Sequence, residues 1–332
     1  MKPKEQKTIL ITGGTGYVGS RVALAIEQRG YPVIIVDIVS PEERGMTFSS
    51  NIEFRRHDLR IPAEADKALR GADVVLHLAA DIGPLNYMHE YQADIIANNS
   101  LIDSAVYPAM VKNGVSSVVY SSSSGVFQHP PKFPYTEKDI TDIKPPTNVY
   151  FFSKLVGEYF CSAFAVQYGL PFTIIRYHNI YGPGEDSKGS SPGDIHVIPA
   201  LLEKVFNGQY PLEFLGNPEA TRPFVYVDDA VEATVELVIR SAEGDESVLY
   251  EDFNIGNGTH HSILELGEMI WEQYGDERAF AHTIIETSAN TSLRREVDIT
   301  KITQLIGWAP RTSLEEGLRP TAEWIKNRRE DK

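Results

Sequence analysis

Apolar residues gather in short runs at regular intervals along the first half of the chain. Five runs occupy residues 8–12, 33–37, 74–78, 118–121 and 172–177, and segments with helical periodicity separate them. The runs are continuously apolar, as in parallel strands whose sheet is covered by helices on both faces. The pattern therefore predicts an α/β fold with a doubly wound parallel sheet.

The alternation of strand and helix changes after Tyr177, where residues 182–193 are rich in Gly, Pro and Ser. The later pattern predicts a helix at 199–206, strands at 212–216 and 224–227, a sheet-covering helix at 228–240, and two amphipathic helices from about His260. Because 332 residues exceed the usual size of a single core, we expect two parts. These are a domain of residues 1–177 plus about 223–258, and a smaller C-terminal lobe of about 178–222 plus 259–328.

Composition and charge narrow the possible partners. The formal net charge of −15 argues against nucleic acid, because binding phosphate backbones needs clustered Lys and Arg. The single cysteine, Cys161, excludes an intramolecular disulfide and a multi-cysteine metal site; we expect a buried apolar residue there and no metal. No uninterrupted apolar run reaches the roughly 18 residues that span a bilayer, and the polar residues 1–7 lead directly into a strand. We therefore expect a cytoplasmic protein with no membrane partner.

Three glycines, Gly13, Gly16 and Gly19, follow the first strand, and a helix with an apolar face follows them. Glycine permits a tight turn and a close approach of the backbone to a pyrophosphate, which then lies at the positive helix N-terminus. The second strand ends at Asp37, about 20 residues further on, where a carboxylate would bind ribose hydroxyls and repel a 2′-phosphate. The unit predicts a Rossmann domain that binds NAD.

Tyr150 and Lys154 are separated by three residues, so in a helix they lie one turn apart on the same face. A tyrosine beside an ammonium and a nicotinamide charge would have a depressed pKa and could exchange a proton with a sugar hydroxyl. Before them, the strand ending in residues 121–125 places serine hydroxyls at the carboxyl edge of the sheet, where open α/β folds bind ligands.

These motifs together resemble the extended short-chain dehydrogenases/reductases that act on nucleotide sugars with NAD. The resemblance covers essentially the whole chain. Its marks are the glycine motif, residues 77–80, Tyr150 with Lys154, residues 176–183, Arg222 before 227–229, residues 254–256, and residues 307–308.

The resemblance implies a site residue by residue. Cofactor contacts would come from Gly13, Gly16, Tyr17, Val18, Gly19, Asp37, Asp58, Leu59, Leu78, Ala79, Ala80, Asn99, Ser121, Tyr150, Lys154 and Tyr177. Contacts to the nucleotide-sugar substrate, in the smaller lobe and beside it, would come from Ser123, Ser124, Asn179, His196, Val197, Arg222 and Arg294, with Arg295 as the alternative to Arg294. Arginines suit the diphosphate because guanidinium groups bind phosphate oxygens bidentately. We expect His77 and His178 to be packed polar residues.

The two residues after Ser123, which matches the catalytic serine of the family, narrow the reaction. In the family that this chain resembles, the 4,6-dehydratases carry an Asp-Glu pair after the serine-rich strand, and the decarboxylases keep the Glu. This chain has Ser124 and Gly125 at those two positions. The 3,5-epimerases of the same family use a cysteine and a lysine. This chain has Gly125 at the position of the cysteine, and His196 aligns approximately with the lysine. The remaining reaction is 4-epimerisation by Ser123, Tyr150, Lys154 and NAD, with a UDP-sugar favoured by analogy.

Other interpretations stay open: a decarboxylase or dehydratase with its acid elsewhere, a 3,5-epimerase, a keto-sugar reductase, or a non-catalytic NAD or nucleotide sensor. We also expect the loop 185–196 to close over the sugar. By analogy, a homodimer would pair through segments 98–112 and 150–168.

Overall fold

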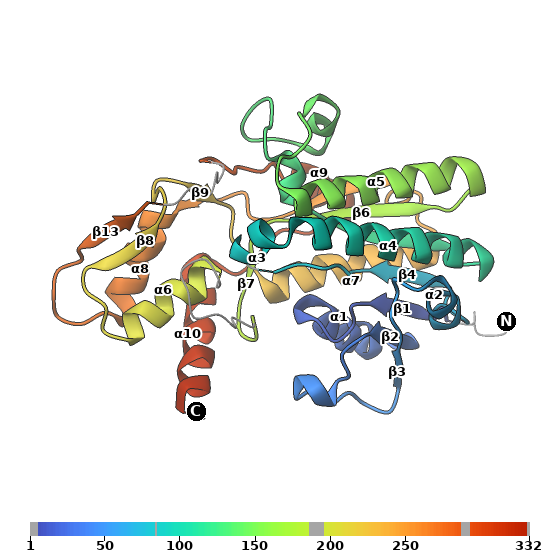
Figure 1. Cartoon of the computed structure of the whole chain (residues 1–332), viewed down its shortest axis with the longest axis horizontal. Helices are drawn as coiled ribbons and strands as arrows, with labels where there is room; N and C mark the ends of the chain where they lie inside the picture. Colours follow the sequence, from blue (N-terminus) through green and yellow to red (C-terminus); the bar gives the residue numbers. More distant parts are fainter. Residues whose placement is uncertain (1–5, 84, 186–195, 287–292, 331–332) are drawn as a thin grey trace.

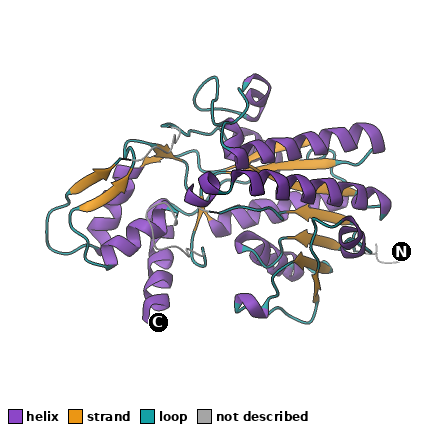
Figure 2. Ribbon diagram, in the orientation of Figure 1, coloured by secondary structure: helices purple, strands orange, loops and turns teal. Residues whose placement is uncertain are grey.

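Seven parallel strands form one sheet at the centre of the molecule (Figures 1 and 2). The computed structural model describes residues 6–83, 85–185, 196–286 and 293–330. The strands are β1 (Ile9–Thr12), β2 (Val33–Asp37), β3 (Ile52–Arg56), β4 (Val74–His77), β5 (Ser117–Ser123), β6 (Phe172–Tyr177) and β11 (Glu251–Ile255). Their order is β11-β6-β5-β4-β1-β2-β3. The chain first adds β2 and β3 on one side of β1, and then adds β4, β5, β6 and β11 on the other side. This confirms the doubly wound sheet and places its switch point between β1 and β4.

Helices cover both faces of the sheet because successive side chains of each strand point to opposite sides. Ile9 and Ile11 lie in one core with α1 and α7, whereas Leu10 lies in the other core with α2, α4 and α5. The bounds of these helices are α1 (Tyr17–Gln28), α2 (Pro62–Ala68), α4 (Gln92–Lys112), α5 (Val149–Tyr168) and α7 (Val227–Glu243). The continuous burial of β1, β2 and β4 follows from this two-sided cover.

A second group of elements lies at one end of the molecule (Figure 1). It contains the parallel pair β8 (Leu212–Leu215) and β13 (His282–Ile285), with α6 (Val197–Phe206), α8 (Ile263–Tyr274) and α10 (Leu314–Glu330). One buried apolar cluster runs from β1 and α1 through α7 to Leu202, Trp271 and Ile325 of this group. The boundary residues of the two expected domains stay a prediction.

The remaining elements are short. They are α3 (Leu85–Glu90), α9 (Thr300–Ile306), β7 (Ile180–Tyr181) paired with β10 (Val225–Tyr226), β9 (Thr221–Arg222) paired with β12 (His261–Ser262), and the 3-10 turns Glu42–Arg44, Ser124–Phe127 and Glu137–Asp142. The sequence predicted two helices after His260, and the structure corrects this to three, α8, α9 and α10. It also adds β3 and β11, which the apolar runs did not reveal.

An excursion between β5 and α5 brings the C-terminal part to the sheet edge. Gln128 closes its base, since its side-chain oxygen accepts hydrogen bonds from the main chain of Thr147 and Asn148 at 2.8 and 3.1 Å. Further out, Tyr135 bridges Val297 in parallel, with its N–H donating to Glu296 at 3.0 Å. The residues just before Val297 are thereby held beside the carboxyl ends of β5 and β6.

Candidate active site

The glycine turn after β1 is packed too tightly for any side chain. Gly13 has φ +68°, and a Cβ there would lie 3.0 Å from the Ala79 nitrogen; a Cβ on Gly19 would lie 2.3 Å from the Gly13 oxygen. Gly16 caps α1 without a side-chain hydrogen bond, and the first turn holds no acid. The free N–H groups of Tyr17, Val18 and their neighbours therefore form a positive cradle with room for a pyrophosphate.

Asp37 stands at the end of β2 beside this turn. Its two oxygens accept hydrogen bonds from the N–H groups of Thr15 and Val39, each at 3.2 Å. The carboxylate is thus fixed in place, and its remaining lone pairs are available to ribose hydroxyls. The cradle and this carboxylate together fit the adenosine diphosphate half of NAD.

The predicted adenine contacts at Asp58 and Leu59 follow β3. Asp58 is bound by Arg60 through Nε at 2.9 Å and Nη2 at 2.6 Å, and these hydrogen bonds hold the Asp58 pKa below its usual range. The Leu59 side chain is buried in the core, so only its main chain can meet a ligand. Arg60, which the sequence analysis missed, also donates to Asn98 at 3.2 Å.

A buried hydrogen-bond chain holds the loop after β4, Leu78 to Ala80. The Thr12 hydroxyl accepts from the N–H groups of Leu78 and Ala79 at 3.1 Å and donates to His77 Nδ1 at 2.7 Å. His77 Nε2 then donates to Asp103 of α4 at 3.1 Å. His77 is therefore a packed polar residue, as predicted, and it fixes the wall of the cofactor site.

Asn99 connects that loop to the catalytic helix. Its Oδ1 accepts from the N–H of Asp81 at 2.6 Å, and its Nδ2 donates to the Ser153 hydroxyl at 2.9 Å. Ser153 in turn donates to the Tyr150 carbonyl at 2.8 Å. The whole amide is thus engaged within the protein, which gives Asn99 a positioning role at the place where a cofactor contact was predicted.

Tyr150 and Lys154 lie on the buried face of α5. Asn148 caps this helix by accepting from Phe151 N–H at 3.2 Å. The Lys154 ammonium donates to the Ser121 carbonyl at 2.7 Å and lies 5.1 Å from the centre of the Tyr120 ring. Burial lowers the Lys154 pKa to about 8, against the opposing effect of the Asp103 carboxylate.

In the cofactor-free protein the pKa of Tyr150 is set by burial alone, and the depression expected beside the cofactor stays a prediction. Burial raises the Tyr150 pKa above its ordinary value instead of depressing it. The phenol therefore keeps its proton in the cofactor-free protein, and any depression has to come from a positive charge that arrives with the cofactor.

Ser123 ends β5 with its hydroxyl poised to donate. Its Oγ accepts from Gly125 N–H at 3.1 Å, so its own proton is free for a ligand. Ser124 is buried behind it. A Cβ on Gly125 would lie only 1.9 to 2.3 Å from three carbons of the Phe151 ring, so the space after the serines is filled by this ring.

A buried ion-pair network lies behind these residues. Glu158, one turn beyond Lys154, accepts from Ser122 at 2.5 Å and from Arg176 at 2.8 and 2.7 Å. Arg176 also donates to Asp252 of β11 at 2.7 Å. The network joins α5 to β5, β6 and β11 and so fixes the helix relative to the serine strand.

Tyr177 and Asn179 follow the end of β6. The Tyr177 hydroxyl bonds the Thr234 hydroxyl of α7 at 2.7 Å, which leaves the ring and main chain to line the site. Asn179 has φ +40°, and its Oδ1 is buried without a hydrogen-bond partner among the described residues. An unpaired amide oxygen in a sparsely populated conformation suits a ligand contact. His178 is a buried polar residue, as expected: its Nδ1 lies 3.4 Å from the Tyr135 hydroxyl and its Nε2 lies 3.4 Å from Asn254 Oδ1.

Two arginines, Arg222 and Arg295, lie near each other and near Tyr135 of the excursion. Arg222 donates to the Thr221 carbonyl at 2.7 Å, and Arg295 N–H bonds the Thr221 hydroxyl at 3.4 Å. Burial and the charge of Arg295 lower the Arg222 pKa to about 9, and burial also lowers the Arg295 pKa. Among the described residues, no carboxylate pairs with either guanidinium. Such a pair is suited to a diphosphate.

The structure favours Arg295 over Arg294 as the second arginine of the diphosphate site, and the substrate contact itself stays a prediction. Arg294 is exposed and forms two hydrogen bonds with Glu296, at 2.7 and 2.8 Å. Arg295 takes its place beside Arg222, because the Tyr135–Val297 bridge turns that side chain inward.

His196 and Val197 begin α6. His196 Nδ1 pairs with Oε1 of the buried Glu185, and Glu185 Oε2 has no hydrogen-bond partner in the described chain. The loop predicted to close over the sugar lies between these residues, outside the described ones.

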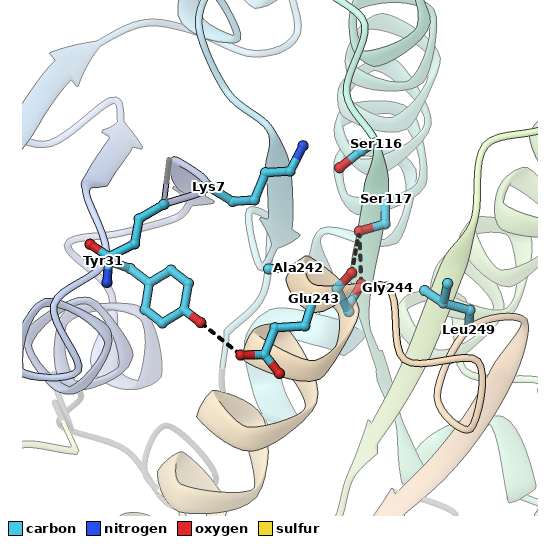
Figure 3. A pocket seen from close by; sticks show the side chains of 10 residues that line it. Lys7, Tyr31, Ser116, Ser117, Ala242, Glu243, Gly244 and Leu249 are labelled. Atoms are coloured by element: carbon cyan, nitrogen blue, oxygen red, sulfur yellow. Dashed lines mark hydrogen bonds between the residues drawn. The ribbon is translucent and has the colours of Figure 1, made fainter. Parts of the chain in front are cut away.

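A further hollow lies at the opposite, amino edge of the sheet (Figure 3). Its polar groups bond one another: Tyr31 donates to Glu243 at 3.2 Å, and Ser117 bonds Ser241 at 2.8 Å. It is separate from the carboxyl edge, where the predicted residues gather.

The geometry defines a Rossmann-type site of the short-chain dehydrogenase/reductase class, with a serine, a tyrosine and a lysine at the carboxyl edge. The family model for the NAD dependent epimerase/dehydratase family matches residues 9–256, and the chain belongs to this family. NAD is thereby confirmed as the cofactor.

Relatives in this family differ in the reactions that their names state. GDP-mannose 3,5-epimerase 1 of Oryza sativa subsp. japonica is 30% identical over 98% of this chain and 83% of its own length. UDP-N-acetyl-alpha-D-glucosaminuronate decarboxylase of Bacillus cytotoxicus is 31% identical over 97% and 98%. The UDP-glucose 4-epimerase of Thermotoga maritima, solved with UDP-glucose, superposes with TM-score 0.82 at 29% identity, covering 97% of this chain and 99% of that one. The chain is therefore a nucleotide-sugar enzyme of this family.

Proposed function

We propose that the protein is a nucleotide-sugar 4-epimerase, with a UDP-sugar as the favoured substrate. The observation that carries the proposal is the contact between Gly125 and Phe151. Position 125 follows the serines and is where dehydratases, decarboxylases and 3,5-epimerases are expected to carry an acid or thiol. Here a phenyl ring fills that space, so the site retains only the groups that oxidation and reduction at one carbon require.

The proposed proton transfers depend on three side chains, and two arginines bind the substrate. Ser123 donates a hydrogen bond from its free hydroxyl to the sugar C4 oxygen and keeps its own proton throughout. Tyr150 removes the C4 hydroxyl proton during oxidation and returns a proton during reduction, and the Lys154 ammonium, one turn away, stabilises its phenolate. Bound NAD supplies the hydride acceptor and a positive charge beside Tyr150. Arg222 and Arg295 bind the diphosphate while the keto sugar rotates to present its opposite face to the cofactor.

The dehydratase, decarboxylase and 3,5-epimerase alternatives each lack a group in the described site. A 4,6-dehydratase or decarboxylase would need an acid, and none of the described residues places one beside Ser123; a 3,5-epimerase would need a thiol, but the sole cysteine, Cys161, is buried against Tyr107. A keto-sugar reductase would use the same trio with an external hydride donor. A non-catalytic sensor has no physical need for Ser123, Tyr150 and Lys154.

Product analysis by NMR tests the reaction. The purified protein is incubated with UDP-, GDP- and dTDP-sugars without added NAD. A C4 epimer of a UDP-sugar is expected, because 4-epimerisation causes no net oxidation and cofactor that stays bound to the purified protein would suffice. Release of carbon dioxide or water would assign a lyase instead, and a requirement for stoichiometric NADH would assign a reductase.

We further propose a homodimer formed through α4 and α5. These helices expose Leu101, Tyr159 and Val166, and Val166 is 90% exposed. By length and composition, α5 is also the one helix among the described residues that is apolar enough to span a membrane, but its other face carries the buried Tyr150 and Lys154. A second copy of the same face would cover these side chains.

Light scattering tests the dimer. Val166→Glu is expected to halve the mass, because the charge would be buried in the interface, whereas Leu24→Glu, an exposed apolar position on α1, should leave it unchanged. A monomeric wild-type protein would contradict the proposal. The cytoplasmic location expected from the sequence stays a prediction.

A further inference from the structure

Phe151 lies between two parts of the site that are far apart in the chain. Its ring packs against Gly125, where three adjacent ring carbons lie within 2.3 Å of the position that a Cβ would occupy. Its ring is 5.8 Å from that of Tyr150, centre to centre, at 61°. The Arg295 guanidinium carbon lies over the same ring, 5.5 Å from its centre.

Arg295 needs such support. Its guanidinium is partly buried beside Arg222, so two positive charges repel each other in a site where no described carboxylate compensates them. A guanidinium over an aromatic face is attracted by the ring quadrupole, and a planar group is held flat on the ring. The stack Gly125–Phe151–Arg295 therefore offers both a compensating interaction and an orientation.

We propose that Phe151 is a positioning residue that holds Arg295 toward the diphosphate of the substrate and so links substrate binding to the catalytic helix. The inference rests on the proposed function for the identity of the ligand. Phe151 directly follows Tyr150 in the first turn of α5 and precedes Lys154 by three residues. A movement of Arg295 against the Phe151 ring would therefore be transmitted to the turn of the helix that carries Tyr150. Position 125 must be glycine because the ring occupies its side-chain space.

The test measures the affinity of UDP by calorimetry, because UDP carries the diphosphate but no sugar. Phe151→Leu keeps an apolar side chain and removes the aromatic face, and it should weaken UDP binding by about 3- to 30-fold. Phe151→Tyr should restore binding to within twofold of wild type. Gly125→Ala should weaken UDP as Phe151→Leu does, since its Cβ displaces the ring. NAD affinity, measured in parallel, monitors folding of the cofactor cradle.

Double-mutant cycles separate positioning from a general loss of structure. In an Arg295→Met background, where neither a cation nor a planar group remains over the ring, Phe151→Leu should have no further effect on UDP affinity. In the matched Arg222→Met background the full effect of Phe151→Leu should persist. Equal coupling to both arginines, or a Phe151→Leu protein that binds UDP within twofold of wild type, would overturn the inference.

The outcomes also distinguish this inference from the proposed function. UDP binding with the expected coupling but without a C4 epimer would retain the positioning role and reject the epimerase. Failure of the wild-type protein to bind UDP at all would reject the UDP-sugar assignment on which both rest.

Discussion

Lys154 carries a positive charge into the interior of the protein. Its ammonium donates to the Ser121 carbonyl, and burial lowers its pKa from an ordinary value of 10.5 to about 8. A lowered lysine pKa means that protonation favours the unfolded chain. The contribution of this side chain to stability therefore rises with pH between about 8 and 10.5 and is most unfavourable below pH 8.

Lys154→Met isolates this effect in the cofactor-free protein. The difference in free energy of unfolding between variant and wild type should change by about 2 to 3 kcal/mol between pH 7 and pH 10, in favour of the wild type as the pH rises. Urea denaturation at both pH values measures it. The other titrating groups are common to both proteins, so their contributions to the pH dependence cancel in the difference. A pH-independent difference would show that burial does not lower the Lys154 pKa.

Tyr150→Phe tests the assigned base. Removing the hydroxyl should lower kcat by about 10²- to 10⁴-fold, because the phenol is the group assigned to exchange the proton of the C4 hydroxyl, and should change NAD affinity by less than about twofold. Tyr159→Phe, on the same helix but 70% exposed, serves as the control and should leave kcat unaffected. Undiminished turnover by Tyr150→Phe would remove this tyrosine from the mechanism.

At the scale of elements, helix α1 and the glycine turn act as one unit. The Gly19 Cα faces the Gly13 carbonyl, and an added Cβ would approach that oxygen to 2.3 Å. Neither backbone atom can rotate away, so α1 would have to move from the turn.

Gly19→Ala should therefore weaken NAD binding by at least about tenfold and destabilise the protein by about 1 to 3 kcal/mol. Gly71→Ala is the matched control, since Gly71 has φ +76° with open space around it and should lose stability without losing NAD affinity. Fluorescence titration with NADH and thermal unfolding measure the two effects. Equal NAD affinities of the two variants would contradict the packing argument.

The central strands could be predicted from sequence, and the edge strands could not. β1, β2 and β4 are covered on both faces and read as continuous apolar runs. β3 lies at one edge, where only Ile52 is buried, and β11 at the other begins with two partly exposed acids. An edge strand buries fewer side chains, so it contains fewer apolar residues than the central strands and does not stand out as an apolar run in the sequence.

The candidate site was predictable where residues act near their own motif. The glycine turn, Asp37, Ser123, Tyr150 and Lys154 all gather at the carboxyl edge. Contacts between distant segments were not predictable: the choice of Arg295 over Arg294 depends on the bridge from Tyr135 to Val297, and the contact of residue 125 with residue 151 has no sequence period.

At the scale of the whole molecule, one apolar core joins the sheet to the C-terminal group of helices. It runs from Ile9 and Val22 through Val231 to Trp271 and Ile325. Tyr181 adds a polar tie, as its hydroxyl donates to the Leu314 carbonyl at 3.3 Å where α10 begins. Neither part can be exposed without uncovering apolar surface of the other.

The cofactor-free protein should consequently unfold in a single transition. Scanning calorimetry is expected to give a calorimetric enthalpy equal to the van't Hoff enthalpy. Two resolved transitions would show that the shared core does not couple the two parts.

The chain also passes repeatedly between the two parts: from β6 out to α6 and β8, back through α7 to β11, and out again to α8 and β13. The C-terminal group is thus assembled from two stretches separated by a helix and a strand of the main sheet. Exchange of this group between relatives would require several junctions in the gene, each beside the shared core. New substrate preferences in such a chain arise more readily by replacing single residues in place than by recombining modules.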